Sequence, residues 1–325
     1  MIISYKNVFN NSLRLFKALS FRRSYNYLKI ILGYYYSRII KKPIVLADPF
    51  SITFEVSSIC NLTCPQCIVG RNETIRNQPF ISNEFVNSTL NQFSGNSFYA
   101  SFYHQGEPLL NKDVFDLIKT AKRLNYYTYL STNGLLLTKD IAKKIINSGL
   151  DKIIISIDGT DQNTYSFYRQ GGSLELVKCG VQKLLKLRLG AKNKTPYIVM
   201  QYMVNKKNEA DLKHAKKFAY SLGVDKLEFK SMQVYDEKDA YLPQNKKYNR
   251  YAASKKRKNS CFRLWSHAIF TSDNNAIVCC NDKIPLHIIS SEIKSNSFWY
   301  SKELLLIRKN ILAGNHPEIC NNCFI

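Results

Sequence analysis

Short runs of β-branched and aromatic residues alternate with amphipathic helical stretches from Ser51 onward, and this alternation constrains the fold more than any other feature. It is typical of repeated strand-helix units around a parallel sheet, because a parallel connection needs a crossover of about a dozen residues. The predicted helices cover residues 83–93, 113–124, 139–148, 174–189 and 209–222. The predicted strands cover residues 52–56, 98–103, 127–131, 152–157, 197–204 and 226–229. Six such strands favour an α/β fold with a partial (β/α)6 barrel over a closed barrel of eight.

A chain of 325 residues can bury one large core and a small additional unit, since single cores seldom exceed about 300 residues. We divide it into a basic helical extension (1–48), the partial barrel (49–243), a basic linker (244–260) and a C-terminal unit (261–325). The C-terminal unit is predicted to contain a strand pair, 268–270 and 276–278, and a helix over 302–312.

The N-terminal extension is strongly basic: residues 1–48 carry nine basic residues and one acidic residue, Asp48. Its apolar residues recur at spacings of three and four, which predicts amphipathic helices. Two interpretations stay open, because the apolar stripe can pack on the main domain or can dock on a membrane surface or an acidic partner. The residues of the stripe are Leu13, Leu15, Phe16, Leu19, Tyr25, Leu28, Ile31, Leu32, Tyr35 and Ile39.

Three cysteines, Cys60, Cys64 and Cys67, directly follow the first predicted strand, with three and two residues between them. A loop of this length can wrap one cuboidal iron-sulfur cluster, each thiolate binding a separate iron. Three thiolates for four irons leave one iron open, as a catalytic metal centre requires. The alternatives are a zinc site or a fully ligated ferredoxin-type cluster. Both normally take four protein ligands, and no fourth cysteine lies nearby in the sequence.

This spacing resembles the hallmark of the radical S-adenosylmethionine (SAM) superfamily, and the resemblance extends from about Ile52 to Cys323. It implies a 4Fe-4S cluster whose open iron chelates the amino and carboxylate groups of SAM. It also implies reductive cleavage of SAM to methionine and a 5'-deoxyadenosyl radical, which removes a hydrogen atom from substrate. A reductant such as flavodoxin or ferredoxin is the implied partner. The tasks left to the protein are orientation, electron delivery and exclusion of water.

The resemblance includes segments at the carboxyl ends of predicted strands, where parallel sheets place their ligands. It implies that Gly106-Glu107-Pro108 receives the SAM amino group and that Arg169 pairs with the SAM carboxylate through its bidentate fork. One departure is Gln66, since the position before the third cysteine is commonly aromatic or methionine and packs near the adenine. The implied cofactor-binding residues are Gly106, Glu107, Pro108, Ser131, Asn133, Ser156, Asp158 and Arg169.

A second cysteine set lies in the last 65 residues. A hairpin bearing Cys279, brought against Cys261 and the terminal pair Cys320 and Cys323, gives four thiolates for one closed cluster. We choose Cys279 rather than Cys280, because neighbouring strand residues face opposite sides. The set resembles the short SPASM or twitch extension of radical SAM enzymes that mature sulfatases, modify ribosomal peptides or dehydrogenate aminocyclitols. We therefore expect one auxiliary 4Fe-4S cluster, with zinc on the same four thiols as the alternative.

Nine cysteines, an odd number in tight clusters, fit a reducing compartment better than a disulfide framework. Cys179 lies apart from both sets and is expected to be an ordinary buried thiol. No secretory signal is recognisable near the N-terminus, and no apolar run approaches the ~20 residues of a membrane span. We therefore expect a cytoplasmic protein without a transmembrane span. The 47 basic against 24 acidic residues indicate an anionic partner or a solvated basic surface.

These features together predict a radical SAM enzyme that oxidises or otherwise modifies a peptide or carbohydrate-like substrate by hydrogen abstraction. One alternative is a non-enzymatic iron-sulfur or zinc protein for binding or electron transfer, which would leave the SAM-binding motifs without purpose. Another is RNA modification, prompted by the basic charge. No recognisable RNA-binding appendage accompanies the barrel, so nucleic acid is not an expected partner. The sequence does not identify a substrate-facing acid or base.

Overall fold

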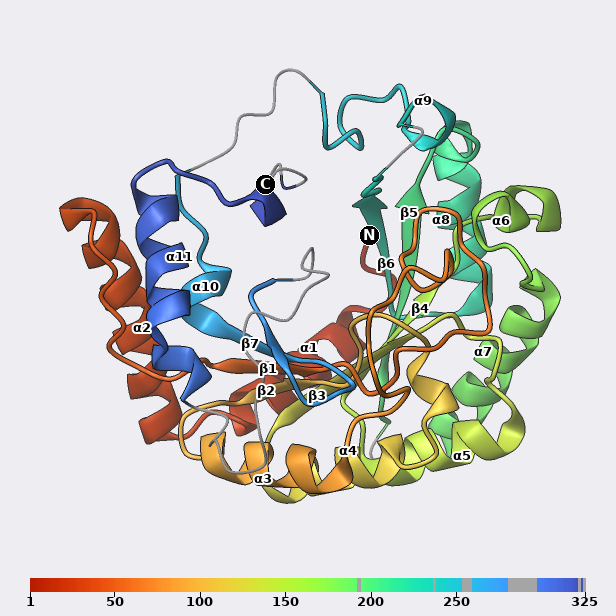
Figure 1. Cartoon of the computed structure of the whole chain (residues 1–325). Coiled ribbons are helices and arrows are strands. Elements are labelled where there is room, and N and C mark those ends of the chain that lie inside the picture. Colours follow the sequence, from red (N-terminus) through yellow and green to blue (C-terminus); the bar gives the residue numbers. More distant parts are fainter. Residues whose placement is uncertain (192–193, 236–237, 253–258, 280–296, 321–322, 324–325) are drawn as a thin grey trace.

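The computed structural model describes residues 1–191, 194–235, 238–252, 259–279, 297–320 and 323. Within them the strands form one open sheet in the order β6-β5-β4-β3-β2-β1-β7-β8. All neighbouring strands are parallel except β7 and β8. The predicted partial barrel is thus confirmed, and Figure 1 shows helices lining its outer side. The strands are β1 Ser51–Phe54, β2 Tyr99–Ser101, β3 Tyr127–Thr132, β4 Lys152–Ser156, β5 Tyr197–Val204, β6 Lys226–Ser231, β7 His267–Phe270 and β8 Ala276–Ile277.

The crossover helices begin and end where local chemistry predicts. The side chains of Ser82, Thr138 and Ser173 each accept a hydrogen bond from the first helical turn that follows them. Gly149 and Gly223 end their helices in the left-handed conformation, as expected from the sequence. The helices are α3 Asn83–Phe93, α4 Val114–Arg123, α5 Lys139–Ser148, α6 Gln162–Tyr168, α7 Leu174–Gly190 and α8 Leu212–Leu222.

The two faces of the sheet differ in chemistry, because successive strand residues point to opposite sides. The face that packs in the main core is apolar and includes Phe54, Phe102 and Phe270, whose rings stack. The residues that alternate with these face the inside of the barrel, where tyrosines of β2 and β3 contact one another. Lys152 and Glu228 belong to the same inner set. The inside of the barrel is therefore mixed, with tyrosines and charged residues beside the apolar side chains of Ile154 and Val199, as a substrate cavity would be.

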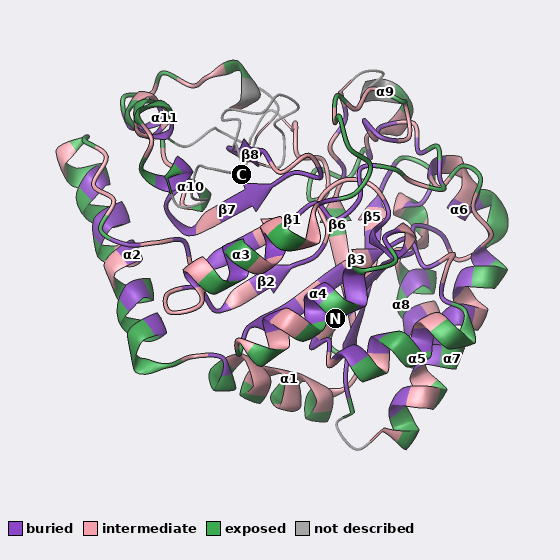
Figure 2. Cartoon of the chain, turned by 60° about the horizontal axis from the view of Figure 1, so that its bottom comes forward, coloured by how far each residue is buried: buried purple, intermediate pink, exposed green. Residues whose placement is uncertain are grey.

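Two N-terminal helices, α1 Tyr5–Lys17 and α2 Phe21–Ile40, run along the margin of the molecule (Figure 2). Helix α1 lies against the amino ends of the strands, where Asn7 donates a hydrogen bond to Asp225 and Asn11 accepts one from the Tyr127 hydroxyl. None of the described helices is both long and apolar enough to cross a membrane.

The C-terminal segment contains α10 Arg263–Ser266, the predicted strand pair and α11 Lys302–Leu312. Strand β7 pairs in parallel with β1, so the pair continues the main sheet rather than standing apart from it. Two indole N–H groups, of Trp265 and Trp299, donate to the carbonyls of Ile44 and Ala47 and tie this segment to the chain after α2. Of the predicted basic linker, residues 253–258 lie outside the described part of the chain. A short helix, α9 Lys238–Tyr241, precedes it.

Candidate metal and cofactor site

The first three cysteines share the loop that leaves β1. Cys64 is buried, and Cys60 and Cys67 are half-buried. The loop closes tightly: the Cys67 N–H donates to the Cys64 carbonyl at 3.1 Å. A Cβ atom at Gly70 would lie 2.5 Å from the Cys64 nitrogen, so the backbone passes where only glycine fits. The loop packs in an apolar cluster built on Leu62, Cys64, Tyr168, Met232 and Val234.

A second loop, Gly106-Glu107-Pro108, is fixed to the cysteine loop by its backbone. The Glu107 N–H donates to the Ile59 carbonyl at 2.8 Å. Gly106 has a φ of 62°, and a Cβ atom there would lie 2.3 Å from the Ser57 carbonyl oxygen. Gly106 is therefore required both by its conformation and by the close approach of the two loops.

The Glu107 side chain is buried and fully engaged by the protein. Its carboxylate accepts hydrogen bonds from the Leu109 N–H, the Thr132 hydroxyl and the Asn133 N–H, at 3.1, 2.7 and 2.8 Å. Burial raises the pKa of Glu107, and these donors oppose the shift. This carboxylate joins the end of β3 to the Gly106-Glu107-Pro108 loop. An ammonium ligand at this motif would therefore have to rely on backbone carbonyls.

Asn133 extends this connection to the sulfurs. Its amide nitrogen donates to the Asn61 side-chain oxygen at 2.7 Å and lies 3.8 Å from the Cys60 sulfur. Its side-chain oxygen accepts from the Leu135 N–H. A predicted cofactor residue thus contacts the cysteine loop directly. Ser131 lies on β3, two residues before Asn133, and is half-buried.

Asp158 and Arg169 form an ion pair beside the cysteines. The Arg169 Nε donates to Asp158 at 2.6 Å, and Asp158 also accepts from the Met203 N–H at 2.7 Å. Burial is the largest single influence and would lower the pKa of Arg169, but the charges of Asp158, Cys64 and two tyrosines together outweigh it and raise the pKa, so the guanidinium stays charged. The Nε contact uses one of five donors. Ser156, the last residue of β4, is also buried.

The three thiols fit an iron-sulfur cluster better than a single metal ion. No three His, Cys, Asp or Glu side chains in the described part of the chain have the spacing that one ion needs. A cuboidal cluster takes each thiolate at a separate corner, which three separated sulfurs on one loop can supply. Burial raises the pKa of Cys60, and raises that of Cys64 to about 11 while Arg169 opposes it. Thiols that resist ionisation by themselves need a cationic group, such as iron, to become thiolates.

Gln66 has a structural contact that its sequence position did not suggest. It is buried, and its side-chain oxygen accepts from the Tyr235 N–H at 2.9 Å. Gln66 therefore links the cysteine loop to the segment that follows β6.

The second cysteine set is distributed over separate segments. Cys261 precedes α10, Cys279 follows β8, and Cys320 and Cys323 follow α11; all four are half-buried. Cys261 and Cys320 pack against the same hydrophobic core. Figure 1 shows the chain returning from α11 toward the middle of the molecule. Cys280 lies outside the described residues.

Cys179 differs from the expectation for a buried thiol. It is half-buried on α7, and its sulfur lies 3.5 Å from a Glu175 carboxylate oxygen. Its helix exposes this position because the buried stripe of α7 runs through Val177, Val181 and Leu184 instead.

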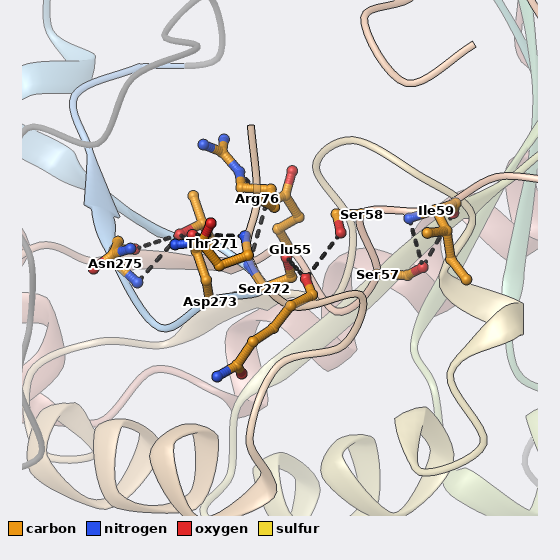
Figure 3. Close-up of polar contacts among 11 residues, drawn as sticks. Glu55, Ser57, Ser58, Ile59, Arg76, Thr271, Ser272, Asp273 and Asn275 are labelled. Atoms are coloured by element: carbon orange, nitrogen blue, oxygen red, sulfur yellow. Dashed lines mark hydrogen bonds and ion pairs between the residues drawn. The ribbon is translucent and has the colours of Figure 1, made fainter. Parts of the chain in front are cut away.

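A buried ion pair at the end of β1 was not predicted. Arg76 contacts Glu55 at 2.8 Å, and Glu55 also accepts from the Ser272 N–H at 3.2 Å. Figure 3 shows this group beside the turn between β7 and β8, where Ser58 and Ser272 both donate to the Gln78 carbonyl. The signal available in the sequence was an acidic residue inside the otherwise mostly apolar predicted strand 52–56. The pair joins the loop after the cysteines to the C-terminal strand pair.

His104 is a second polar group that the sequence reading missed. Its Nε2 is buried and has no hydrogen-bond partner among the described residues. Burial lowers the pKa of His104, which favours the neutral imidazole. It lies two positions before Gly106, close to the charges of Glu55, Arg76 and Arg263.

The sequence of this chain matches the profile of a known protein family. The profile of the radical SAM superfamily matches residues 54–219, just over half of the chain. A protein of Methanococcus maripaludis named "Probable GTP 3',8-cyclase" is 33% identical over 160 residues, covering 48% of this chain and 52% of that protein. The PqqA peptide cyclase of Gluconobacter oxydans is 27% identical over 201 residues, covering 61% and 54%. The chain thus matches about half the length of these curated relatives.

Solved structures share the fold. SuiB of Streptococcus suis, bound to its precursor peptide SuiA, superimposes with a TM-score of 0.62 and 13% identity, over 81% of this chain and 67% of that one. The structure titled native anSMEcpe with bound AdoMet gives a TM-score of 0.59 and 16% identity, over 85% and 86%. At these identities the likeness concerns the fold alone.

Proposed function

The chain belongs to the radical SAM superfamily, and on this premise we propose that Cys60, Cys64 and Cys67 hold a 4Fe-4S cluster with one iron open to SAM. When bound, the cluster and SAM supply a 5'-deoxyadenosyl radical that abstracts hydrogen from substrate. The observation that carries this proposal is the hydrogen-bonded unit of Glu107, Asn133 and the cysteine loop. It ties together the segments that the superfamily uses for the cluster and for SAM.

The roles of the cofactor-binding residues follow from their contacts. The charged Arg169 guanidinium, held by Asp158 through Nε, keeps its other donors for a carboxylate such as that of SAM. The backbone carbonyls near Gly106 take the SAM amino group, while Glu107 positions the loop. Asn133 orients Cys60, and Ser131 and Ser156 line the same carboxyl edge of the sheet.

We infer a peptide substrate, and two comparisons support this choice. One relative carries the name PqqA peptide cyclase and aligns with 61% of the chain, and one structure of the same fold is bound to a precursor peptide. The inner face of the barrel supplies tyrosines and buried polar groups, which suit the mixed surface of a peptide. We assign His104, whose lowered pKa favours the neutral imidazole, as a proton acceptor for this substrate.

We assign a second 4Fe-4S cluster to Cys261, Cys279, Cys320 and Cys323. Its support is the presence of four thiols in the C-terminal region, two of which, Cys261 and Cys320, pack against the same hydrophobic core. This cluster would take an electron from the substrate or shape the pocket. The enzyme would work in the reducing cytoplasm with a flavodoxin or ferredoxin as reductant.

The test is anaerobic reconstitution with iron and sulfide, followed by reduction with dithionite in the presence of SAM. Wild-type protein should form 5'-deoxyadenosine, measured by chromatography, and Cys64→Ala should form none. Cys179→Ala is the matched control, because Cys179 is a thiol of the same chain outside both sets, and it should retain wild-type activity. Undiminished product from Cys64→Ala would overturn the assignment.

The substrate class is tested in the same assay. Candidate precursor peptides encoded beside this reading frame should stimulate 5'-deoxyadenosine formation and gain a mass change. His104→Gln should lose peptide product while retaining the SAM cleavage seen without peptide, since His104 touches neither the cysteines nor Arg169 in the described contacts. Stimulation by sugars or cyclitols and not by peptides would contradict the peptide assignment.

A further inference from the structure

Helix α1 turns its apolar stripe to solvent. Tyr5, Phe9, Leu13 and Phe16 follow one another at spacings of four, four and three, and so lie on one face of the helix. All four are exposed, Phe9 by 64% and Phe16 by 68%. No residue of α1, which is described throughout, is buried.

Helix α2, which has 20 residues, also turns an apolar stripe to solvent. Its buried face includes Arg23, Asn26 and Ile30, whereas its most exposed large apolar residues lie on another face. Phe21 is 90% exposed and Ile39 is 77% exposed. The solvent-facing residues of α2, spaced by four and three in turn, are Phe21, Tyr25, Leu28, Leu32, Tyr35 and Ile39.

This exposure is specific to the N-terminal region. Of the 23 large apolar residues that are exposed in the described chain, 14 lie within residues 1–40. Isolated exposed apolar residues are ordinary, but a continuous exposed stripe on each of two consecutive helices calls for a partner. We refer to the ten residues of the two stripes together as the N-terminal apolar surface.

The inward face of each helix is already held by polar contacts. In α1, Asn7 contacts Asp225 at 2.5 Å, and Asn11 contacts the Tyr127 hydroxyl at 2.7 Å. In α2, the buried Arg23 donates to the carbonyls of Ser94 and Leu124. Apolar residues of the inward faces also pack in the protein, namely Val8 and Leu15 of α1 and Ile30 and Tyr34 of α2. Both helices are therefore fixed in orientation, and the exposed apolar stripes cannot turn into the core without breaking these contacts. The interpretation that the stripe packs on the main domain is wrong for most of its residues.

The charges around this surface have one sign. Lys6, Lys17, Arg22, Lys41 and Lys42 are exposed, and no acidic residue precedes Asp48 in the chain. Beside α2, a pocket of about 290 Å³ is lined by Arg22, Lys29 and Tyr25. Its one carboxylate belongs to Asp48, which accepts hydrogen bonds from Asn96 and Tyr300.

We propose that the N-terminal apolar surface docks onto an anionic lipid bilayer, with α1 and α2 lying in the plane of the interface. Aromatic and leucine side chains enter the boundary between headgroups and acyl chains, while the surrounding cations face anionic headgroups. Neither helix is long and apolar enough to span the membrane, so the mode is surface association. This proposal goes beyond the radical SAM function and does not depend on either cluster.

A second copy of this chain fits the surface less well. The four-three spacing on α2 is that of a coiled-coil seam, but such seams are flanked by charges of both signs. Two α1–α2 units would bring cations against cations, with no acidic residue of their own to pair with them.

The experiment is co-sedimentation of the full chain with vesicles. Wild-type protein should bind phosphatidylcholine vesicles containing about a quarter phosphatidylglycerol, and should not bind pure phosphatidylcholine vesicles. The double variant Phe9→Ser/Phe16→Ser should lower binding about tenfold or more, because it removes two inserting rings. Lys6→Glu/Lys17→Glu should weaken binding and reduce its salt sensitivity.

Matched variants separate this surface from general charge and hydrophobicity. Leu189→Ser/Tyr220→Ser removes two side chains that are 80% and 72% exposed elsewhere, and Lys213→Glu/Lys216→Glu reverses two exposed charges on α8. Both should bind vesicles like wild type, and all four variants should keep the wild-type unfolding midpoint. Three results would overturn the proposal: no binding to anionic vesicles, equal loss in the α8 charge variant, or a wild-type dimer that Phe9→Ser/Phe16→Ser makes monomeric. If soluble polyglutamate, added at the same total negative charge as the anionic lipid, displaced the protein from the vesicles, the surface would be assigned to an acidic protein instead.

Discussion

The two cysteine sets of this protein are built in opposite ways. Cys60, Cys64 and Cys67 lie within eight residues of one loop, and Gly70 and Gly106 let the backbone close around it. The second set comes from three segments separated by up to forty residues of sequence, and its position depends on the packing of β7 and α11.

The difference teaches where each site obtains its geometry. The first loop is held by the Glu107 N–H, which donates to the Ile59 carbonyl, and by the Asn133 amide, which donates to Asn61 and contacts Cys60. A buried hydrogen bond joins Asn133 to the Glu107 carboxylate. The second depends on tertiary contacts such as those of Arg308, which is buried and donates to the carbonyls of Leu264 and Trp299. We therefore expect the first site to respond to single polar substitutions nearby, and the second to respond to the stability of its whole region.

The largest effect should come from Glu107→Ala. It leaves the Leu109 N–H, the Thr132 hydroxyl and the Asn133 N–H without their acceptor in a buried site. Each orphaned donor costs about 1–3 kcal/mol, so we expect a loss of several kcal/mol in stability. Formation of 5'-deoxyadenosine should fall about a hundredfold or more, since the Gly106-Glu107-Pro108 loop and Asn133, which contacts Cys60, lose the carboxylate that joins them. Thermal unfolding and the chromatographic assay measure the two effects.

Glu84→Ala is the control for this substitution, because Glu84 is an exposed carboxylate in the first turn of α3. It should change neither iron content nor SAM cleavage. Wild-type behaviour of Glu107→Ala would mean that the cysteine loop is held by its own backbone contacts alone.

Cys320→Ala should have the next largest effect, and a different one. We expect the reconstituted protein to lose roughly half of its iron while SAM cleavage stays within about threefold of wild type, because the substitution removes a ligand of the proposed second 4Fe-4S cluster. Cys279→Ala should behave in the same way and Cys280→Ala should not, which tests the choice between the two neighbours. Colorimetric iron determination and the 5'-deoxyadenosine assay check this prediction. Equal loss of SAM cleavage in Cys320→Ala and Cys64→Ala would show that the two sites are not separate.

The contrast also explains what the sequence could predict. The strands, most helix ends and the first cysteine loop follow from local spacing, and they are found where expected. The pairing of β7 with β1 joins residues more than two hundred positions apart, and nothing in the run His267–Phe270 indicates its neighbour. Glu55 and Arg76 read as separate charges until the loops bring them together.

For the N-terminal helices, the interpretation that the apolar stripe packs on the main domain is wrong for a different reason. Their periodicity is correct, but periodicity does not say which face of a helix is buried. In α1, Asn7 and Asn11 lie on the inward face, beside Val8 and Leu15, because Asp225 and Tyr127 offer them hydrogen-bond partners. Such partners are known only from the fold.

A smaller effect is expected from acid, and it should fall on the C-terminal region first. His267 on β7 is largely buried, and burial, with a contribution from the Arg263 charge, lowers its pKa to about 4 from an ordinary value of about 6.5. Between these values the unfolded chain binds a proton that the folded protein does not. Stability is therefore full above about pH 6.5 and falls as the pH drops toward 4, by at most about 1.4 kcal/mol per pH unit.

Urea unfolding at several pH values measures this dependence. Both tryptophans, Trp265 and Trp299, lie in the C-terminal region, so their fluorescence reports it selectively. His267→Asn removes the titrating group and keeps a polar partner for Ser266, and it should flatten the pH profile. If the stability of the variant depended on pH as steeply as that of wild type, other groups, such as His104, would be responsible for the pH dependence.

The smallest effect should come from Gln66→Met. This substitution tests the contact between the first cysteine loop and the segment after β6, which leads toward the second cysteine set. The superfamily commonly has an aromatic residue or methionine here, whereas Gln66 accepts a hydrogen bond from the Tyr235 N–H. If Gln66 serves the loop, Gln66→Met should cost about 1 kcal/mol of stability and leave the KM for SAM nearly unchanged. A lower KM with unchanged stability would instead mean that the position belongs to the cofactor. Gln66→Glu, which keeps an acceptor of similar shape, should preserve the contact with Tyr235, so that the loss in Gln66→Met is traced to that hydrogen bond and not to side-chain volume.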